Sequence, residues 1–370
     1  MRQTLDVNAG VGGRSPRYDH GMQSKAQTRL APHRRTRATA AMVAALAGVS
    51  TATVSLVTNG KTAGRVSAEN IAKVERAVAE LGYVVDGIGS SLAKGRSNIV
   101  ILVAPDVSNP FFADVIAGAR DAMGQEFQLL LSVTDAGQTP EPEDVRKLFS
   151  LRPAGFLVDA PSAEFLADLA PTGPMVILDA PGISSLAPSI NIDVAQGARD
   201  LADHLAAAGH RKVAYLDSLT GTETFRVRRE AFSEQAAKAG MVIPEGATAS
   251  TNIDVGAAAM AFAGAWPAWR RAGVTAVVCC TDTHAYGVLQ EARVEGVRIP
   301  EQLAVAGFDD LPYSATSNPG LTTVHLPARA LGTMAGERLR RLMEGSDVDE
   351  PDVMLASNLV VRGSTVAAQA

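Results

Sequence analysis

The chain has few cysteines and few aromatic residues. Only two of its 370 residues are cysteines, Cys279 and Cys280, and aromatic residues make up 5% of the total. Adjacent cysteines cannot hold a fold together through disulfide bonds, and one pair cannot supply the four ligands of a structural zinc site. These shortages exclude a disulfide-rich secreted protein and a zinc-finger protein.

Long apolar runs, a secretory leader and common catalytic motifs are also missing. The longest apolar run is about Ile99–Ala104, far short of the roughly 18–20 residues that span a bilayer. The first residues do not combine a positive charge with an apolar core. There is no phosphate-binding loop, no His-Glu-x-x-His, and no Gly-x-Gly-x-x-Gly after a strand. We therefore expect a cytoplasmic protein with no membrane partner, cofactor, metal site or catalytic residues.

Charge is distributed unevenly along the chain. Residues 1–97 contain 14 Lys and Arg against 6 Asp and Glu, a formal charge of +8, whereas residues 98–370 carry −13. A basic module on an acidic body is typical of a protein whose one end contacts an anionic polymer. The alternative is that an arginine-rich tail inflates the count, because residues 39–97 alone carry only +2.

The first part of the chain changes character near Thr39. Residues 1–38 are rich in Gly, Ser, Arg and Gln without apolar periodicity, which predicts a disordered extension. A short apolar helix is expected over residues 40–47, ending at Gly48. Ser50 is a suitable N-cap for a second helix over residues 51–58.

A third helix begins after Ser67 and ends at Gly82, with its apolar residues on one face. We expect four side chains to form the small core of the three helices: Val43, Leu46, Val49 and Val54. Two short helices joined by a turn with glycine, and a third behind them, match the helix-turn-helix plan. A generic three-helix bundle would show the same features.

Several motifs in this region resemble those of the lac repressor (LacI/GalR) family. They are residues 43–55 (VAALAGVSTATVS), Asn59-Gly60-Lys61, Val66-Ser67 and residues 80–83. The similarity continues from about Thr39 to Gly363. It implies a helix-turn-helix DNA-binding domain over residues 39–84, a hinge over residues 85–97, and an effector-binding and dimerisation domain over residues 98–370.

The resemblance also implies which side chains contact DNA. Base-facing positions hold Thr51, Ala52 and Leu56, and the remaining DNA-contacting positions hold Thr39, Ser50, Thr53, Asn59 and Ser67. Hydroxyl and amide donors to phosphates fix the register without selecting a sequence. Leu56 departs from the family, in which arginine is common there, and leucine cannot make the bidentate guanine contact. Met42 and Ile71 stand where the family has aspartate and arginine.

The linker between the two parts resembles the family's hinge, which becomes helical only on the operator. Leu92 matches the leucine that wedges between base steps in the minor groove, and Ala93 matches its small neighbour. Gly87 and Gly89 disfavour a helix by roughly 1 kcal/mol each. A plain flexible linker is the alternative.

The acidic body alternates strand-like and helix-like segments. The strand-like runs are residues 99–104, 128–133, 155–158, 175–178, 212–216, 276–280 and 303–306, and helix-like segments such as 197–208 and 286–295 follow them. This alternation predicts parallel sheets covered on both faces. The expected fold class is a small all-α helix-turn-helix head plus an α/β periplasmic-binding-protein-like body of two doubly wound parallel-sheet lobes. The type of the body is implied by residues 103–112, which resemble the first strand-to-helix loop of sugar-binding periplasmic proteins.

Ligands of open α/β sheets bind at the carboxyl ends of the strands. The candidate effector-binding residues in such loops, or matched by the resemblance, are Asn109, Phe111, Phe112, Arg228, Asp282, Asp309 and His325. Carboxylate and guanidinium groups suit a polyol in a closed cleft. Each residue also has a structural interpretation as a helix cap or core side chain. Thr281 and Ala180 replace asparagine and arginine of the family, which suggests an unusual ligand.

These observations predict a homodimeric transcriptional regulator, a repressor by resemblance. Its partners would be a double-stranded DNA operator and a small-molecule effector, a sugar or sugar derivative. A dimer is expected because residues 361–370 lack the leucine-rich helix of the family's tetramers. The alternative is a solute-binding protein of the periplasmic type without DNA-regulatory activity.

Overall fold

The computed structural model describes residues 38–83, 97–104, 107–134, 140–169, 173–181, 183, 187–346 and 352–365. The chain divides into two compact units, Met1–Val85 and Asp86–Ala370. The predicted hinge residues Leu92 and Ala93 lie outside the described residues, as does the predicted extension up to residue 37. These predictions stay predictions.

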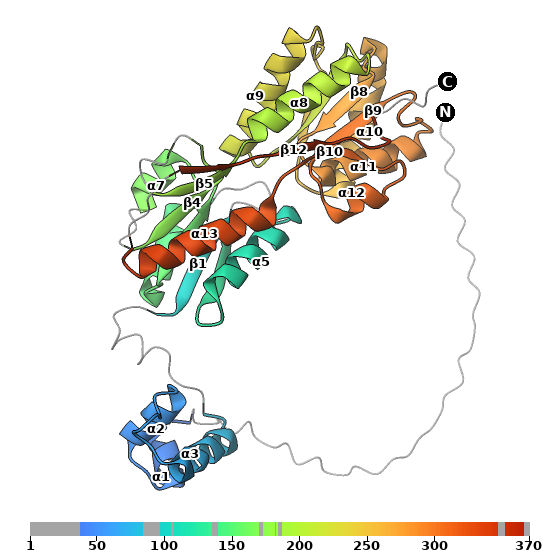
Figure 1. Cartoon of the computed structure of the whole chain (residues 1–370). Helices are drawn as coiled ribbons and strands as arrows, with labels where there is room; N and C mark the ends of the chain where they lie inside the picture. Colours follow the sequence, from blue (N-terminus) through green and yellow to red (C-terminus); the bar gives the residue numbers. More distant parts are fainter. Residues whose placement is uncertain are drawn as a thin grey trace, which may run out of the picture. The chain divides into compact units, whose positions relative to one another are not determined.

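Three helices form the N-terminal unit: α1 (Ala40–Ala47), α2 (Thr51–Thr58) and α3 (Ala68–Leu81) (Figure 1). The angle between α1 and α2 is 104°, within the range of helix-turn-helix motifs. Each helix begins after a residue whose side-chain hydroxyl accepts a hydrogen bond from the backbone N–H three residues later. These N-caps are Thr39, Ser50 and Ser67. Gly48 ends α1 at a φ of 66°, which a side chain would strain.

The core of this unit is small and differs from the prediction at one position. Val43 and Val54 are buried as predicted, Val49 is partly buried, and Val74 and three alanines complete the core. The prediction for Leu46 was wrong, because its side chain is 47% exposed. Val43, Ala44 and Ala47 form the buried face of α1, and Leu46 projects from another side of the helix.

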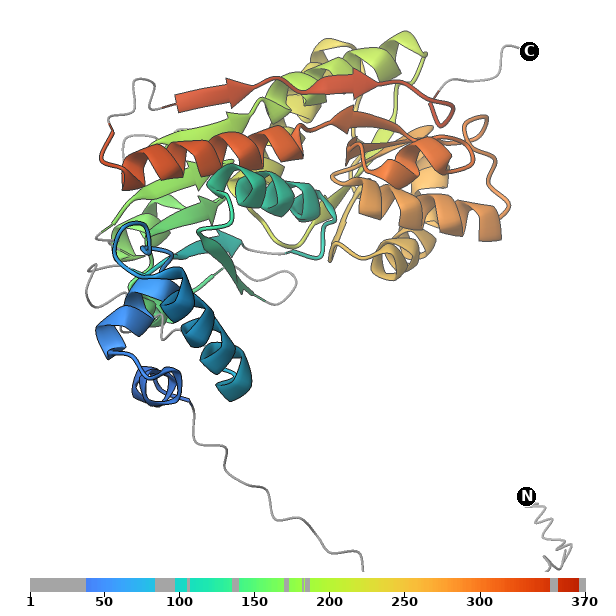
Figure 2. The same ribbon diagram turned by 60° about the horizontal axis from the view of Figure 1, so that its bottom comes forward.

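The first lobe of the C-terminal unit contains a six-stranded sheet in the order β11-β5-β4-β3-β1-β2. Its strands are β1 (Ile99–Ala104), β2 (Gln128–Val133), β3 (Gly155–Asp159), β4 (Met175–Leu178), β5 (Ser189–Ile192) and β11 (Asp352–Leu355). All its neighbouring strands are parallel. Helices α5 (Phe111–Met123) and α13 (Ala328–Met343) lie side by side on one face (Figure 2). Helices α6 (Pro142–Lys147) and α7 (Ala163–Leu169) cover the other.

Alternation along β1 explains why both faces are covered. Val100 and Leu102 belong to the cluster that includes α5 and α13, whereas Ile101 and Val103 belong to the cluster under α6 and α7. All four side chains are fully buried. A continuous apolar strand of this kind is typical of a parallel sheet between two helix layers, as the sequence predicted.

The second lobe repeats the plan with the order β12-β10-β9-β8-β6-β7. Its strands are β6 (Val213–Ser218), β7 (Thr248–Thr251), β8 (Ala276–Cys279), β9 (Ala304–Asp309), β10 (Thr322–His325) and β12 (Asn358–Val360). Its helices are α8 (Val194–Ala207), α9 (Glu223–Lys238), α10 (Val255–Ala272), α11 (Asp282–Val294) and α12 (Pro312–Thr316). The strands are parallel except for the edge strand β12, which is antiparallel to β10.

The chain passes between the lobes three times (Figure 1). The crossings join β5 to α8, β10 to α13, and β11 to β12. Two crossings touch: the Asp193 N–H donates to the Leu355 carbonyl at 2.8 Å, and Ser357 Oγ donates to the Asp193 carbonyl at 2.6 Å. Among the described helices, none is by itself long and apolar enough to cross a membrane; α1 and α2 reach that length only together, across their bend.

Candidate functional site

A cavity of about 490 Å³, including space open to solvent, lies between the two lobes. The first lobe contributes Asn109, Phe111, Phe112, Asp159, Ala160 and Asp179. The second lobe and the crossing after β10 contribute Thr220, Thr222, Thr224, Phe225, Arg228, Ile253, Asp309 and Leu326. The lining combines carboxyl, hydroxyl, guanidinium and aromatic groups.

Five of the seven predicted effector-binding residues are brought together here: Asn109, Phe111, Phe112, Arg228 and Asp309. Asn109 follows β1, and Asp309 ends β9. The Asn109 Nδ2 atom donates a hydrogen bond to Asp309 Oδ2 at 3.0 Å, which joins the two lobes across the cavity. Phe111 and Phe112, in the first turn of α5, pack edge to face with centroids 5.6 Å apart.

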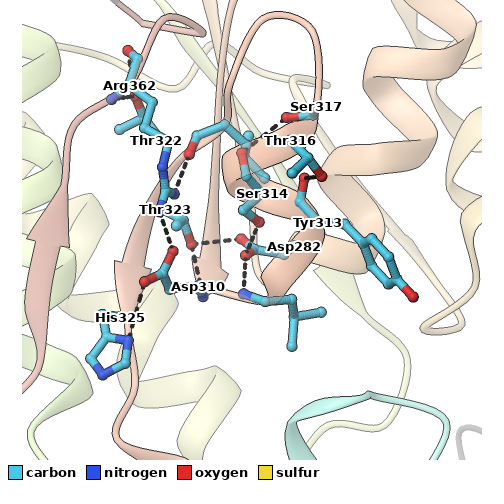
Figure 3. A network of polar contacts seen from close by, with 12 residues as sticks. Asp282, Asp310, Tyr313, Ser314, Thr316, Ser317, Thr322, Thr323, His325 and Arg362 are labelled. Carbon is cyan, nitrogen blue, oxygen red and sulfur yellow. Dashed lines mark hydrogen bonds and ion pairs between the residues drawn. The ribbon is translucent and has the colours of Figure 1, made fainter.

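Asp282 does not line the cavity, contrary to its predicted place. It lies fully buried at the start of α11, where Oδ1 accepts from Thr323 Oγ1 at 2.6 Å. Oδ2 accepts from the Leu311 N–H at 2.9 Å and from Ser314 Oγ at 2.5 Å (Figure 3). The helix was expected near Tyr286 but begins at Asp282 itself. The carboxyl group therefore links α11 to β10 and to the start of α12.

His325 also lies away from the cavity lining. Its Nδ1 is 3.2 Å from Asp310 Oδ2, and the other oxygen of Asp310 accepts from Arg362 Nη2 at 2.7 Å (Figure 3). It borders a neighbouring hollow that shares Phe111, Asp309 and Leu326 with the interlobe cavity. The structure thus places His325 beside the crossing after β10, as the sequence suggested, but not in contact with the cavity.

The sequence analysis missed two acidic residues of the lining. Asp159 ends β3, and Asp179 follows β4 directly. The signal was available, because both aspartates come straight after strand-like apolar runs. The backbone marks the same place: of the five described non-glycine residues with positive φ, Ala160 (42°), Asp179 (47°) and Asp309 (114°) line the cavity. Such strained residues cluster at functional sites.

Arg228 projects from α9 and is only 3% exposed. Its guanidinium carbon lies 4.5 Å from the centroid of the Phe308 ring and 5.2 Å from that of Phe225. Its Nη1 donates to the Cys280 carbonyl, and its Nε has no hydrogen-bond partner. The rings and the carbonyl hold the guanidinium in one orientation, with one N–H group left for a ligand.

Burial controls the protonation of the three carboxyl groups in the cavity. It raises the pKa of Asp179 to about 6, although the Ile192 N–H and Arg228 act to lower it. Burial likewise raises the pKa of Asp309 to about 7 against the lowering effect of Arg228 and Asn109. The pKa of Asp159 lies well above its ordinary value because of burial and the neighbouring Asp179. These groups are suited to exchange hydrogen bonds with a ligand rich in polar hydrogens.

The N-terminal unit presents the residues that the resemblance places on DNA. Thr51, Ala52 and Asn59 are exposed, whereas Thr53 and Leu56 are half-buried. Thr39, Ser50 and Ser67 are exposed at the N-termini of the three helices. Backbone N–H groups and the helix dipole make helix N-termini favourable for phosphate. The geometry is compatible with phosphate contacts from three helices.

Each of the two units of the chain matches a known protein family. Residues 41–86 match the family described as bacterial regulatory proteins, lacI family, and residues 202–365 match the periplasmic binding protein-like domain. The HTH-type transcriptional repressor PurR of Photobacterium profundum is 30% identical over 329 residues, which cover 87% of this chain and 97% of PurR.

Solved structures are similar over most of the chain. A transcriptional regulator CelR–cellobiose complex is 27% identical with a TM-score of 0.63, covering 89% of this chain and 100% of CelR. The lac repressor dimer bound to operator and the anti-inducer ONPF is 24% identical with a TM-score of 0.73, covering 90% of this chain and 100% of the repressor chain, and this likeness shows the fold. The chain belongs to the lacI family of bacterial regulatory proteins and is a DNA-binding transcriptional regulator.

Proposed function

We propose that this regulator is a repressor whose affinity for a DNA operator is controlled by a small molecule bound between the two lobes. The observation that carries the proposal is the interlobe cavity, in which Asn109 of one lobe contacts Asp309 of the other. A ligand that contacts both lobes favours one arrangement of them, and that preference is the free energy available for regulation. PurR, the similar protein named above, is a transcriptional repressor.

Operator recognition is assigned to α2 and to the helix N-termini of the N-terminal unit. Thr51, Ala52 and Leu56 would face the bases, and Ser50, Thr53, Asn59, Ser67 and Thr39 would contact the backbone of the duplex. The exposed hydroxyl N-caps support this assignment. The hinge residues Leu92 and Ala93 would enter the minor groove.

The effector is proposed to be a sugar or sugar derivative that occupies the cavity. Asn109, Arg228, Asp309, Asp159 and Asp179 would bind its polar groups. The aromatic pair Phe111 and Phe112 offers an apolar surface for a ring face. The CelR complex contains cellobiose, as its description states.

The active form is proposed to be a cytoplasmic homodimer without catalytic activity. β2 lies at the edge of the first sheet, and Leu130, Leu131 and Val133 on it are 41–46% exposed. An uncovered apolar edge strand promotes aggregation, so a second copy of the chain is a suitable cover. The lac repressor structure with the same fold is a dimer on its operator.

Footprinting of the tagged protein across the genome, followed by shift assays on the recovered sites, tests the proposal. A repressor would give palindromic sites, and its binding would weaken steeply with salt. A test compound from the pathway encoded beside a recovered site should change the operator affinity. A periplasmic-type solute-binding protein would give no enriched site and only weak nonspecific DNA binding, and that result would overturn the proposal.

A further inference from the structure

The described lining of the interlobe cavity contains three carboxyl groups and one basic group. Asp159, Asp179 and Asp309 are 5–7% exposed, and Arg228 is 3% exposed. One guanidinium can compensate one carboxylate. The lining therefore has an excess of two acidic groups in a place where water reaches them poorly, and a buried charge without a partner is unfavourable.

The hydrogen bonds show which acidic group is least satisfied. Asp179 Oδ1 accepts from the Ile192 N–H at 3.0 Å, and Asp309 Oδ2 accepts from Asn109 at 3.0 Å. Asp159 Oδ1 is buried without a hydrogen-bond partner. A buried polar atom without a partner in a cavity calls for a group from outside the chain, either water or a ligand. The ionised form of Asp159 accepts only, so the group that satisfies it is a donor.

A bound metal ion is a poor match for this excess of acid. Within the part of the chain that the structure describes, no group of three or more His, Cys, Asp or Glu is placed to hold an ion. The hydroxyls of Thr220, Thr222 and Thr224 and the aromatic rings instead line the cavity as they would for an organic ligand. A donor that also carries positive charge would satisfy Asp159 and balance the charge.

We propose that the effector is an amino-substituted polyol, such as an amino sugar, whose ammonium group binds Asp159 beside Asp179. This inference rests on the proposed function, because it names the chemical class of the same effector. The ammonium supplies three hydrogen-bond donors and one positive charge. Asp309, Asn109 and Arg228 remain for the hydroxyl groups. Asp159 is then the residue that selects the amine over the neutral sugar.

Proton release gives the binding a signature. Burial raises the pKa values of Asp159, Asp179 and Asp309, and among the described lining residues Arg228 is the one basic group. An ammonium beside Asp159 and Asp179 lowers their pKa values, so protons leave as the ligand enters. Affinity for an amino compound should therefore rise from about pH 5.5 to about pH 7, the range in which these carboxyl groups titrate and the amine of the ligand stays protonated. A neutral sugar lacks the charge that produces this release.

Calorimetric titration of the full chain tests the inference with matched pairs of probes. The probes are D-glucosamine against D-glucose and D-galactosamine against D-galactose, with N-acetyl-D-glucosamine as an uncharged amine derivative. We expect an amino sugar to bind at least tenfold tighter than its neutral counterpart, with proton release in buffers of different ionisation enthalpy. Asp159→Asn should reduce this preference at least tenfold. Asp121→Asn, at an exposed carboxylate on α5, should leave it unchanged.

Three results would overturn the inference: a neutral sugar that binds as tightly as its amine, an unchanged preference in Asp159→Asn, or no binding of any amino sugar. A shift assay on the operator with the same preparation separates this failure from failure of the proposed function. If a neutral compound binds and alters operator affinity, the proposed regulatory function is supported and the proposed amino-substituted effector is wrong. If glucosamine is preferred but no operator is bound, the ligand class stands and the regulatory function is wrong.

Discussion

Asn109 and Asp309 are 200 positions apart in the sequence, yet Asn109 Nδ2 donates a hydrogen bond to Asp309 Oδ2 at 3.0 Å. Asn109 lies just before α5 in the first lobe, after strand β1, and Asp309 is the last residue of β9 in the second lobe. The bond forms only when the lobes are close together. Because both residues line the interlobe cavity, a ligand that contacts either of them acts directly on the contact that joins the lobes.

Asn109→Ala should shift the effector-free protein toward a more open arrangement of its lobes. A hydrogen bond of this kind contributes about 0.5–1.5 kcal/mol, enough to change the ratio of open to closed forms by roughly two- to tenfold. Small-angle X-ray scattering should show a larger radius of gyration. The control is Asn98→Ala, because the Asn98 amide donates to the Glu126 carbonyl within the first lobe. Identical scattering of both variants would contradict a latch between the lobes.

The free energy of unfolding should fall as pH rises from about 6.5 to about 8.5. Burial raises the pKa of Asp309 to about 7 and that of Asp282 to about 8. The folded chain therefore holds protons that the unfolded chain, with ordinary aspartate pKa values, has already lost. Stability decreases with pH wherever the folded state binds more protons. Below about pH 6.5 His284 offsets part of this trend without reversing it, because burial lowers the pKa of its imidazole to about 4.

Urea denaturation at closely spaced pH values measures this slope. Asp309→Asn removes one of the titrating groups while its new amide oxygen can still accept from Asn109, so its slope should be shallower. Asp121→Asn, at an exposed position, should keep the slope of the parent. Stability that does not fall between pH 6.5 and 8.5 would show that these carboxyl groups are already ionised in the folded protein.

Asp282→Ala should lower stability without changing the ligand preference of the folded protein. The substitution leaves the Leu311 N–H and the hydroxyls of Ser314 and Thr323 without their acceptor, and each such buried loss costs about 1–3 kcal/mol. Asp282→Asn is the matched variant, because its amide can still accept from Leu311. Chemical denaturation should therefore rank the alanine variant well below the asparagine variant. A large loss of effector affinity in a folded Asp282→Asn protein would mean that Asp282 takes part in effector binding after all.

In the N-terminal unit, local sequence rules predicted where the helices begin and end better than which side chains are buried. The caps Thr39, Ser50 and Ser67 and the ends at Gly48 and Gly82 follow from the chemistry of a single turn. The prediction that Leu46 is buried was wrong because α1 has only eight residues, and its apolar residues do not form a single stripe. Which of them is buried depends on how α3 packs.

The strands of the body were predicted where their residues form an apolar run, as in β1 and β8. Strands β5, β7, β10, β11 and β12 were missed, because each has only three or four residues and includes at least one polar residue. In the cavity, Asn109 and Asp309 were found from their places at strand ends. Asp159 obeys the same rule and was missed. No local pattern reveals that Asp282 turns toward β10, because that depends on where α11 begins.

Leu56→Arg should give the head a new contact with DNA if α2 lies in the major groove. Leu56 is half-buried on α2, and an arginine that faces the bases binds guanine O6 and N7 with two hydrogen bonds. We expect a preference for guanine of about 1–3 kcal/mol at one operator position. Ala79→Arg adds the same charge at an exposed site on α3 and should raise affinity for all sequences without a base preference. Selection of binding sites from a random DNA pool measures both variants, and equal sequence profiles would mean that Leu56 does not face the bases.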